Sequence, residues 1–214
     1  MALLVNEIFY SIQGESLYSG RPCVFVRLTG CNLRCAYCDT RYAYEEGQKM
    51  EIREILDRIA LERCPLIAIT GGEPLFQSDT PRLIQVLLEK DYEVIMETNG
   101  SFDISRIDKR CVKIIDVKCP SSKESHHNDL ENLKILNAVD QVKLVIANRK
   151  DYEYAKEIIR LIPSEFPRDR ILFSPVSGRM DPAEMAEWIL ADHLGVRLQL
   201  QLHKIIWPDK IRGV

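Results

Sequence analysis

The chain has 214 residues, of which 46% are hydrophobic and 29% are charged, and this is the profile of an ordinary soluble domain with one sizeable core. The formal net charge is −3, from 29 basic and 32 acidic side chains, so we expect neither nucleic acid nor a membrane surface as a main partner. The N-terminus lacks the basic stretch of a signal peptide and no window of 18 apolar residues occurs, so we expect a cytoplasmic protein.

Short apolar runs that are rich in β-branched residues and bounded by turn residues predict strands throughout the chain. In chain order, the predicted strands are Leu3–Tyr10, Cys23–Leu28, Leu66–Thr70, Glu93–Glu97, Val112–Val117, Gln141–Ile146, Arg170–Phe173 and Val196–Leu202. Between most of them, apolar residues recur at helical spacing and predict amphipathic helices. These helices are expected around Ile52–Ile59, Leu83–Leu87, Tyr154–Leu161 and Met185–Ile189.

Strands that alternate with helices are typical of a parallel sheet covered by helices. The run Leu66–Ile69 is apolar on both faces, as the buried strands of such a sheet are. A closed barrel of eight units needs roughly 250 residues, and only about six units are predicted. The sequence therefore predicts an α/β fold with a partial, open (β/α)6-type barrel, formed by one domain over residues 1–214. The N-terminal strand and the tail after His203 are additions to it.

Three of the seven cysteines, Cys31, Cys35 and Cys38, lie in the loop after the first core strand. This is the end of the strand at which barrel folds carry out their chemistry. A structural zinc site needs four ligands in paired clusters, and no second pair follows. Three thiolates on a 4Fe-4S cluster instead leave one iron open to another ligand. The spacing thus favours a cluster, and we expect the remaining cysteines to be small buried apolar groups: Cys23, Cys64, Cys111 and Cys119.

The Cys-x3-Cys-x2-Cys motif, with Tyr37 before its last cysteine, resembles the signature of the radical S-adenosylmethionine enzymes. A second element supports the resemblance, because Thr70-Gly71-Gly72-Glu73-Pro74 ends the second core strand as a similar motif does in that superfamily. The resemblance implies that the open iron binds the methionine part of S-adenosylmethionine and that the glycine–glutamate motif contacts its amino group. A glycine backbone can approach a ligand closely, and a carboxylate complements an ammonium group.

Further segments narrow the resemblance to the 7-carboxy-7-deazaguanine synthases over essentially the whole chain. They are Phe9–Ser16, Arg27, Asp39-Thr40 and Leu200–Lys204. The resemblance implies conversion of 6-carboxy-5,6,7,8-tetrahydropterin to 7-carboxy-7-deazaguanine with loss of ammonia, in the biosynthesis of queuosine and other deazapurines. It also implies three cofactors, which are the 4Fe-4S cluster, S-adenosylmethionine and Mg²⁺.

The same resemblance implies the site residues. For the substrate, they are Arg27 at the carboxylate, Ile12, Gln13, Gly14, Glu15 and Thr70 at the pterin edge, His203 as a donor or proton relay, and the carboxylate of Val214 at the exocyclic amine. For the cofactor, they are Tyr37, Cys38, Asp39, Gly72, Glu73, Asp116 and Lys118, and Thr40 is the magnesium ligand. The family often has Ser-Pro-Lys where this chain has Asp116-Val117-Lys118.

Simpler roles and other functions remain open at this stage. Arg27 could belong to an ion pair, Glu15 to a turn, His203 to the core and Thr40 to a local cap, and the adjacent His126 and His127 are expected in a solvated loop. A glycyl-radical activating enzyme has the same cysteine spacing but acts on a protein. A non-enzymatic iron–sulfur or zinc protein is the more distant alternative. We further expect a homodimer and an electron donor such as flavodoxin.

Overall fold

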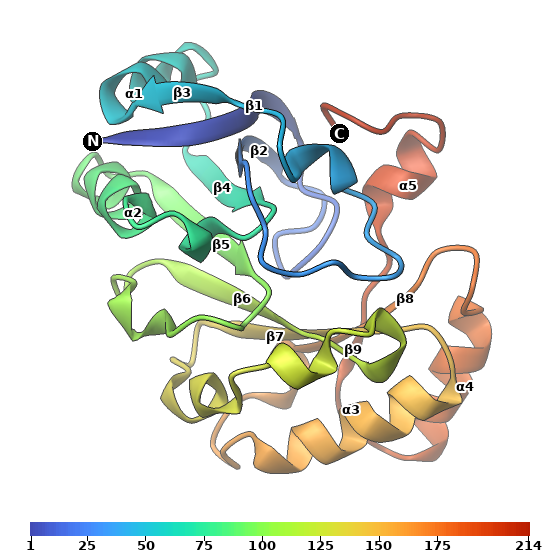
Figure 1. The fold of residues 1–214 in the computed structure, drawn as a ribbon. Coiled ribbons are helices and arrows are strands. Elements are labelled where there is room, and N and C mark those ends of the chain that lie inside the picture. The colour runs from blue at the N-terminus through green and yellow to red at the C-terminus, as the bar shows by residue number, and fades with distance from the viewer.

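A computed structural model describes residues 1–214 and contains a single mixed sheet of nine strands (Figure 1). In chain order, the strands are β1 (Ala2–Ile12), β2 (Pro22–Leu28), β3 (Gln48–Glu51), β4 (Leu66–Gly71), β5 (Glu93–Thr98), β6 (Val112–Val117), β7 (Gln141–Ile146), β8 (Ile171–Pro175) and β9 (Arg197–Leu198). The helices are α1 (Ile52–Leu61), α2 (Thr80–Glu89), α3 (Arg149–Leu161), α4 (Pro182–Ala191) and α5 (Leu202–Ile206).

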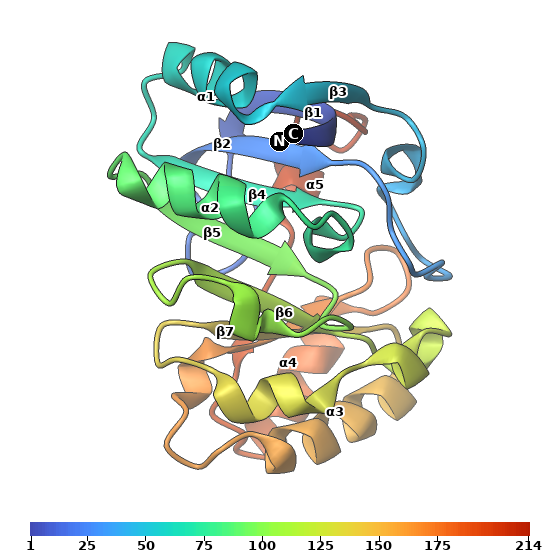
Figure 2. The ribbon, with the colours of Figure 1, turned by 60° about the vertical axis from the view of Figure 1, so that its left-hand side comes forward.

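The sheet order is β3-β1-β2-β4-β5-β6-β7-β8-β9, and its two edge strands do not pair with each other. Strands β2 and β4 to β9 run parallel, whereas β1 is antiparallel to both β2 and β3. The sheet is therefore curved but not closed, which confirms the predicted α/β fold with an open partial barrel and an added N-terminal strand. Figure 2 shows α1, α2 and α3 on one face and α5 on the other.

The strands are fully buried where the sequence is apolar on both faces. Every residue from Leu66 to Ile69 in β4 is at most 1% exposed, because helices cover one face and the barrel interior the other. Helix α1 buries Ile55 and Ile59 against this core, and α2 buries Leu83 and Leu87. The helical spacing of these apolar residues is the reason that both segments fold as predicted.

Two strands differ from the prediction. Strand β3 was not predicted, because Gln48, Lys49 and Glu51 are polar and exposed, and only Met50 is buried in it. It forms because β1 offers a free edge to pair with. The strand predicted over Val196–Leu202 is reduced to β9, since the chain then turns away from β8. The Leu202 amide donates to the Gly14 carbonyl at 2.9 Å, and α5 begins at that residue.

Candidate active site

A cavity of about 790 Å³ opens at the carboxyl ends of the parallel strands. Its walls come from the end of β1, the loop after β2, the ends of β4 to β8 and the C-terminal tail. All the site residues predicted from the sequence line it except Glu73: Ile12, Gln13, Gly14, Glu15, Arg27, Cys31, Cys35, Tyr37, Cys38, Asp39, Thr40, Thr70, Gly72, Asp116, Lys118, His203 and Val214. The fold thus brings segments from the two ends of the chain to one place.

The loop after β2 presents the three thiols to this cavity. Cys31, Cys35 and Cys38 are free and half-buried, whereas the other four cysteines are buried, as predicted. The three sulfurs do not all lie within 4.8 Å of one another. Two thiolates on one tetrahedral zinc would lie about 3.8 Å apart, so this spacing does not fit a single zinc ion.

Neighbouring loops hold the cysteine loop in place. The Ala36 amide donates to the Ser122 carbonyl at 2.9 Å, and the Arg34 amide donates to Glu124 Oε1 at 3.0 Å. The phenol of Tyr37 donates to the Val145 carbonyl at 3.4 Å. Burial raises the pKa of Cys35 to about 11, and a coordinated metal favours the thiolate form of such a thiol.

The glycine-rich turn after β4 packs directly against this loop. A Cβ atom at Gly72 would collide with the Gly30 carbonyl, and one at Gly71, whose φ is +136°, would collide with the Leu28 carbonyl. The backbone closes the contact with hydrogen bonds from the Gly72 amide to Leu28 (3.0 Å) and from the Glu73 amide to Gly30 (2.8 Å). Both glycines are therefore required by packing between two strand ends.

Glu73 does not face the cavity, which differs from the expected contact with the cofactor. Its side chain is fully buried. Its carboxylate accepts hydrogen bonds from the Leu75 amide (2.9 Å), the Thr98 hydroxyl (2.8 Å) and the Asn99 amide (2.6 Å). Burial nevertheless raises the pKa of Glu73. Because three protein donors already engage it, Glu73 holds the ends of β4 and β5 together, and the geometry does not favour a direct ligand contact.

Arg27 lies in the cavity with part of its guanidinium group still free. Its Nε donates to Glu7 Oε1 at 2.8 Å, and its side chain is only 11% exposed. The guanidinium carbon lies 5.4 Å from the Phe9 ring centroid and 5.8 Å from that of Tyr42. The two terminal nitrogens have no hydrogen-bond acceptor in the protein. The ion pair and the rings thus fix the group, while its two terminal nitrogens stay available for an anion.

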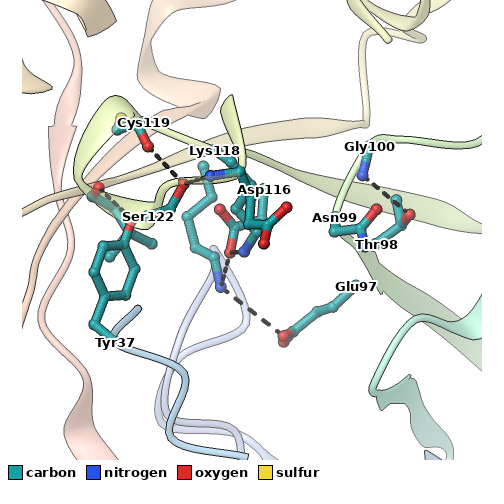
Figure 3. A network of polar contacts seen from close by, with 12 residues as sticks. Tyr37, Glu97, Thr98, Asn99, Gly100, Asp116, Lys118, Cys119 and Ser122 are labelled. Atoms are coloured by element: carbon teal, nitrogen blue, oxygen red, sulfur yellow. Dashed lines mark hydrogen bonds and ion pairs between the residues drawn. The ribbon is translucent and has the colours of Figure 1, made fainter. Parts of the chain in front are cut away.

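Charged side chains fill the deeper part of the cavity. Lys118 Nζ lies 2.8 Å from Asp116 Oδ2, and Lys143 Nζ lies 2.8 Å from Glu15 Oε2. Glu97 Oε2 lies 4.0 Å from Lys143 Nζ, and Figure 3 shows Glu97, Asp116 and Lys118 in the same polar network. Burial alone would raise the pKa of Glu15, but Lys143 and hydrogen bonds hold it below its ordinary value. Burial raises the pKa of Glu97 above its ordinary value.

The C-terminal tail lines one side of the cavity. The imidazole of His203 packs so closely on Gly14 that a Cβ atom there would collide with it. Two ion pairs join the tail to the segment after the cysteines, from Lys204 to Asp39 (2.7 Å) and from Arg212 to Glu46 (2.7 Å). These contacts place Val214 at the cavity wall.

Comparison with known proteins agrees with this arrangement. The sequence profile of the radical SAM superfamily matches residues 25–189. A 7-carboxy-7-deazaguanine synthase of Chlorobaculum tepidum is 46% identical over 99% of this chain and 97% of its own length. One from Koribacter versatilis is 42% identical over 98% and 99%. The crystal structure of QueE from Escherichia coli, 23% identical, has the same fold, with a TM-score of 0.80 over 94% of both chains.

The chain belongs to the 7-carboxy-7-deazaguanine synthase family. It is therefore a radical S-adenosylmethionine enzyme, and the alternatives of a glycyl-radical activating enzyme or a non-enzymatic module are not favoured. Membership of the superfamily implies a 4Fe-4S cluster and S-adenosylmethionine. No helix of the structure has the length and apolar character needed to span a membrane.

The residues present fit both of these groups. The three thiols supply three cluster ligands and no fourth cysteine lines the cavity, as an open iron requires. Asp116 Oδ1 is buried with no hydrogen-bond partner in the protein, so a donor from a bound ligand can satisfy it. The pair formed by Asp116 and Lys118 lines the same cavity as the thiols.

Sequence reasoning missed several polar residues of the cavity. The most buried charged residue among them is Lys143, and the others include Glu97, Asn99 and Gln201. A signal was present for Lys143, because a lysine within the apolar run Gln141–Ile146 has to find a buried partner. Glu97, at the end of β5, carries the same signal more weakly. His126 and His127 lie outside the cavity and are exposed, which agrees with the predicted solvated loop.

Proposed function

We propose that this protein converts 6-carboxy-5,6,7,8-tetrahydropterin to 7-carboxy-7-deazaguanine with loss of ammonia, in the biosynthesis of queuosine or another deazapurine. One observation carries the proposal. A single cavity holds the three thiols, the free guanidinium donors of Arg27 and the carboxylates of Glu15 and Glu97. A pterin that bears a carboxylate needs a cationic fork at one end and hydrogen-bond acceptors at its amide and amine edge. The names of the relatives support the same reaction.

The bound cluster and S-adenosylmethionine supply the one-electron chemistry that removes a hydrogen atom from the substrate carbon bearing the carboxylate. The protein itself binds and orients. Arg27 receives the substrate carboxylate on its terminal nitrogens, because Glu7 and two aromatic rings keep the guanidinium group still. Gln13, Glu15 and Thr70 form hydrogen bonds with the amide and amine edge of the pterin.

The C-terminal tail contributes two further groups that bind the substrate. Burial lowers the pKa of His203, so its imidazole is neutral at pH 7 and can both donate and accept a hydrogen bond. The carboxylate of Val214 accepts from the exocyclic amine. Support for these roles comes from the packing of His203 on Gly14 and from the place of Val214 in the cavity wall.

We propose that Thr40 is the protein ligand for Mg²⁺ and that Asp39 lies on the cofactor side of it. Mg²⁺ prefers oxygen ligands and keeps several waters, so one hydroxyl together with the substrate is sufficient. The Thr40 hydroxyl donates to Asp39 Oδ1 at 3.1 Å, and both residues line the cavity. Tyr37, Cys38, Gly72, Asp116 and Lys118 complete the proposed cofactor site.

We further propose that residues 1–214 act as one domain, that the protein works in the cytoplasm as a homodimer, and that a small reductant such as flavodoxin delivers the electrons. The net charge of −3 supports a small-molecule substrate in preference to nucleic acid.

The function is tested by anaerobic reconstitution with iron and sulfide. The holoenzyme is incubated with reductant, S-adenosylmethionine, Mg²⁺ and carboxytetrahydropterin, and the product is identified by mass. We expect 7-carboxy-7-deazaguanine and one equivalent of ammonia. Cleavage of S-adenosylmethionine without any change in the pterin would show that the substrate is another molecule.

A further inference from the structure

Lys143 lies on β7 with its ammonium group among three carboxylates from different elements. Its Nζ is 2.8 Å from Glu15 Oε2, 3.8 Å from Asp116 Oδ2 and 4.0 Å from Glu97 Oε2. The residue is only 6% exposed and lines the cavity. Glu15 and Lys143 are 128 residues apart in the sequence, so only the tertiary fold creates this group.

Two other cations that line the cavity are paired with other carboxylates. Lys118 binds Asp116 at 2.8 Å, and Arg27 binds Glu7 at 2.8 Å. Lys143 is therefore the one cation within 4.0 Å of Glu15 and of Glu97. Two buried carboxyl groups without a cation between them tend to share a proton, because two like charges close together are costly.

A carboxylate that is ionised accepts hydrogen bonds only, whereas a protonated one also donates. The two Glu15 oxygens accept from Lys143 at 2.8 Å and from Gln201 Nε2 at 2.7 Å. A carboxylate has about four acceptor positions, so Glu15 keeps about two for a ligand. Because Lys143 and Gln201 hold the Glu15 carboxylate, its remaining acceptor positions point in fixed directions.

We propose that Lys143 is a positioning residue for the substrate, which keeps Glu15 ionised and oriented beside Glu97 so that both carboxylates accept the amide and amine N–H groups of the pterin. This inference rests on the proposed function and specifies how the cavity selects a ligand with an amidine-like, donor-rich edge. Lys143 acts through the two glutamates and does not itself touch the reacting atoms.

The expected pH dependence of pterin binding follows from the charged and titratable groups that face Glu15 and Glu97. Lys143 and His203 act on Glu15, and Lys143, Arg27, Glu15 and Asp116 act on Glu97. Lys143 favours the ionised form of Glu15 at acid and neutral pH, and His203 does so when it is protonated. Loss of Lys143 therefore raises the pH below which Glu15 becomes protonated, and pterin binding should weaken at higher pH than in the wild type.

The experiment uses the holoenzyme with its cluster assembled and S-adenosylmethionine bound, and measures the Kd of carboxytetrahydropterin between pH 5.5 and 8.5. For Lys143→Met we expect binding at pH 7 to weaken about tenfold or more, and the acid midpoint of the binding profile to rise by about 1 pH unit or more. Lys143→Arg keeps the charge and should restore most of the midpoint. The Kd of S-adenosylmethionine should change little, because Asp116 retains Lys118.

Lys113→Met is the matched control. Lys113 is 3% exposed, also lies on a parallel strand and is paired with a buried carboxylate, Asp140, but it does not line the cavity. This variant should lose stability without any shift in the binding profile. Equal midpoints for Lys143→Met and the wild type, or an equal shift in the control, would overturn the proposal.

A second variant, Glu15→Gln, tests the proposal even if Lys143→Met does not fold. Glu15→Gln retains Lys143 and imitates a carboxyl group that cannot ionise, so its binding should be weak and the acid limb should be smaller. Unchanged binding by Glu15→Gln would also overturn the proposal. If instead the wild type fails to bind this pterin at any pH, the proposed function itself is overturned, and the role of Lys143 in binding this substrate falls with it.

Discussion

Lys113 and Lys143 are almost equally buried, at 3% and 6% exposed, yet they lie at opposite ends of the barrel. Lys113 is near the start of β6, where its Nζ is 3.1 Å from Asp140. That carboxylate also accepts from the amides of Lys113 (2.9 Å) and Asn137 (2.8 Å). At this end, the buried charges find all their partners within the protein.

At the carboxyl ends of the strands, the charges are left incomplete. Lys143 faces three carboxylates, Asp116 Oδ1 has no partner, and the terminal nitrogens of Arg27 have no acceptor. Charges that a fold pairs internally serve stability, and unpartnered polar atoms that line a cavity are available to a ligand. The difference between the two ends therefore separates the stabilising part of the molecule from the reactive part.

The cysteines differ between the two ends of the barrel in the same way, and replacing one at the carboxyl end is expected to have the largest effect on activity. Cys31→Ala should abolish cluster assembly and turnover, because one of three ligands at the carboxyl end is lost. Cys111→Ala, next to β6 at the amino end, should keep full iron content, since burial raises the pKa of that thiol to about 12 and leaves it inert. Iron and sulfide analysis after anaerobic reconstitution checks both. A cluster that requires Cys23, Cys64, Cys111 or Cys119 would contradict the assignment.

Lys113→Met tests whether the buried charge pair at the amino ends of the strands serves stability alone. It leaves Asp140 buried without its cation, so we expect the free energy of unfolding to fall by about 3 kcal/mol. Urea unfolding measures this change. Steady-state kinetics should show an unchanged KM for the pterin, because the pair lies outside the cavity. A rise in KM would mean that the two ends are coupled.

Arg27→Lys tests the carboxyl end without removing charge. A lysine ammonium cannot make the two-pronged contact of the guanidinium group, so we expect kcat/KM to fall about 100-fold, or roughly 3 kcal/mol of lost hydrogen bonding. Cluster content and cleavage of S-adenosylmethionine without substrate should be preserved. Turnover near the wild-type level would place the substrate carboxylate elsewhere.

An extension of a few Gly and Ser residues after Val214 moves the terminal carboxylate away from the cavity wall. We expect the KM for the pterin to rise about tenfold, as for the loss of one charge-assisted contact, with an intact cluster. The same extension placed before Met1 is the control, because the N-terminal amine pairs only with the exposed Glu51. If the two extensions have equal effects, the tail carboxylate has no role in binding.

The smallest effect is expected from His203, a cavity residue whose pKa is lowered by burial. The folded state binds its proton less readily than the unfolded state does, so stability is lost as pH falls through the ordinary value near 6.5. The loss should stay below about 1 kcal/mol, since the group is only partly buried. Urea midpoints at pH 5.5 and 7.5 measure it, and His203→Gln should reduce the difference. An equal pH effect in that variant would assign it to another group.

The sequence alone determined the parts of this protein that depend on neighbouring residues. The three cysteines, the glycine-rich turn, six of the parallel strands and α1 to α4 could be predicted, because ligand spacing and hydrophobic periodicity are local. The polar strand β3 and the end of β9 could not, since both depend on which free edge or carbonyl the fold brings near.

Only the tertiary structure decided which strand-end carboxylates face the cavity. Glu73 follows an apolar strand and Glu97 lies at the end of the next one, and the sequence favoured Glu73 as the ligand. In the fold, Glu73 turns inward to the Leu75 amide and to two donors at the end of β5, whereas Glu97 and Lys143 meet in the cavity. The physical reason is that a side chain's direction at a strand end depends on the pleat, the register and the next loop, and these are set by contacts between residues far apart in the sequence.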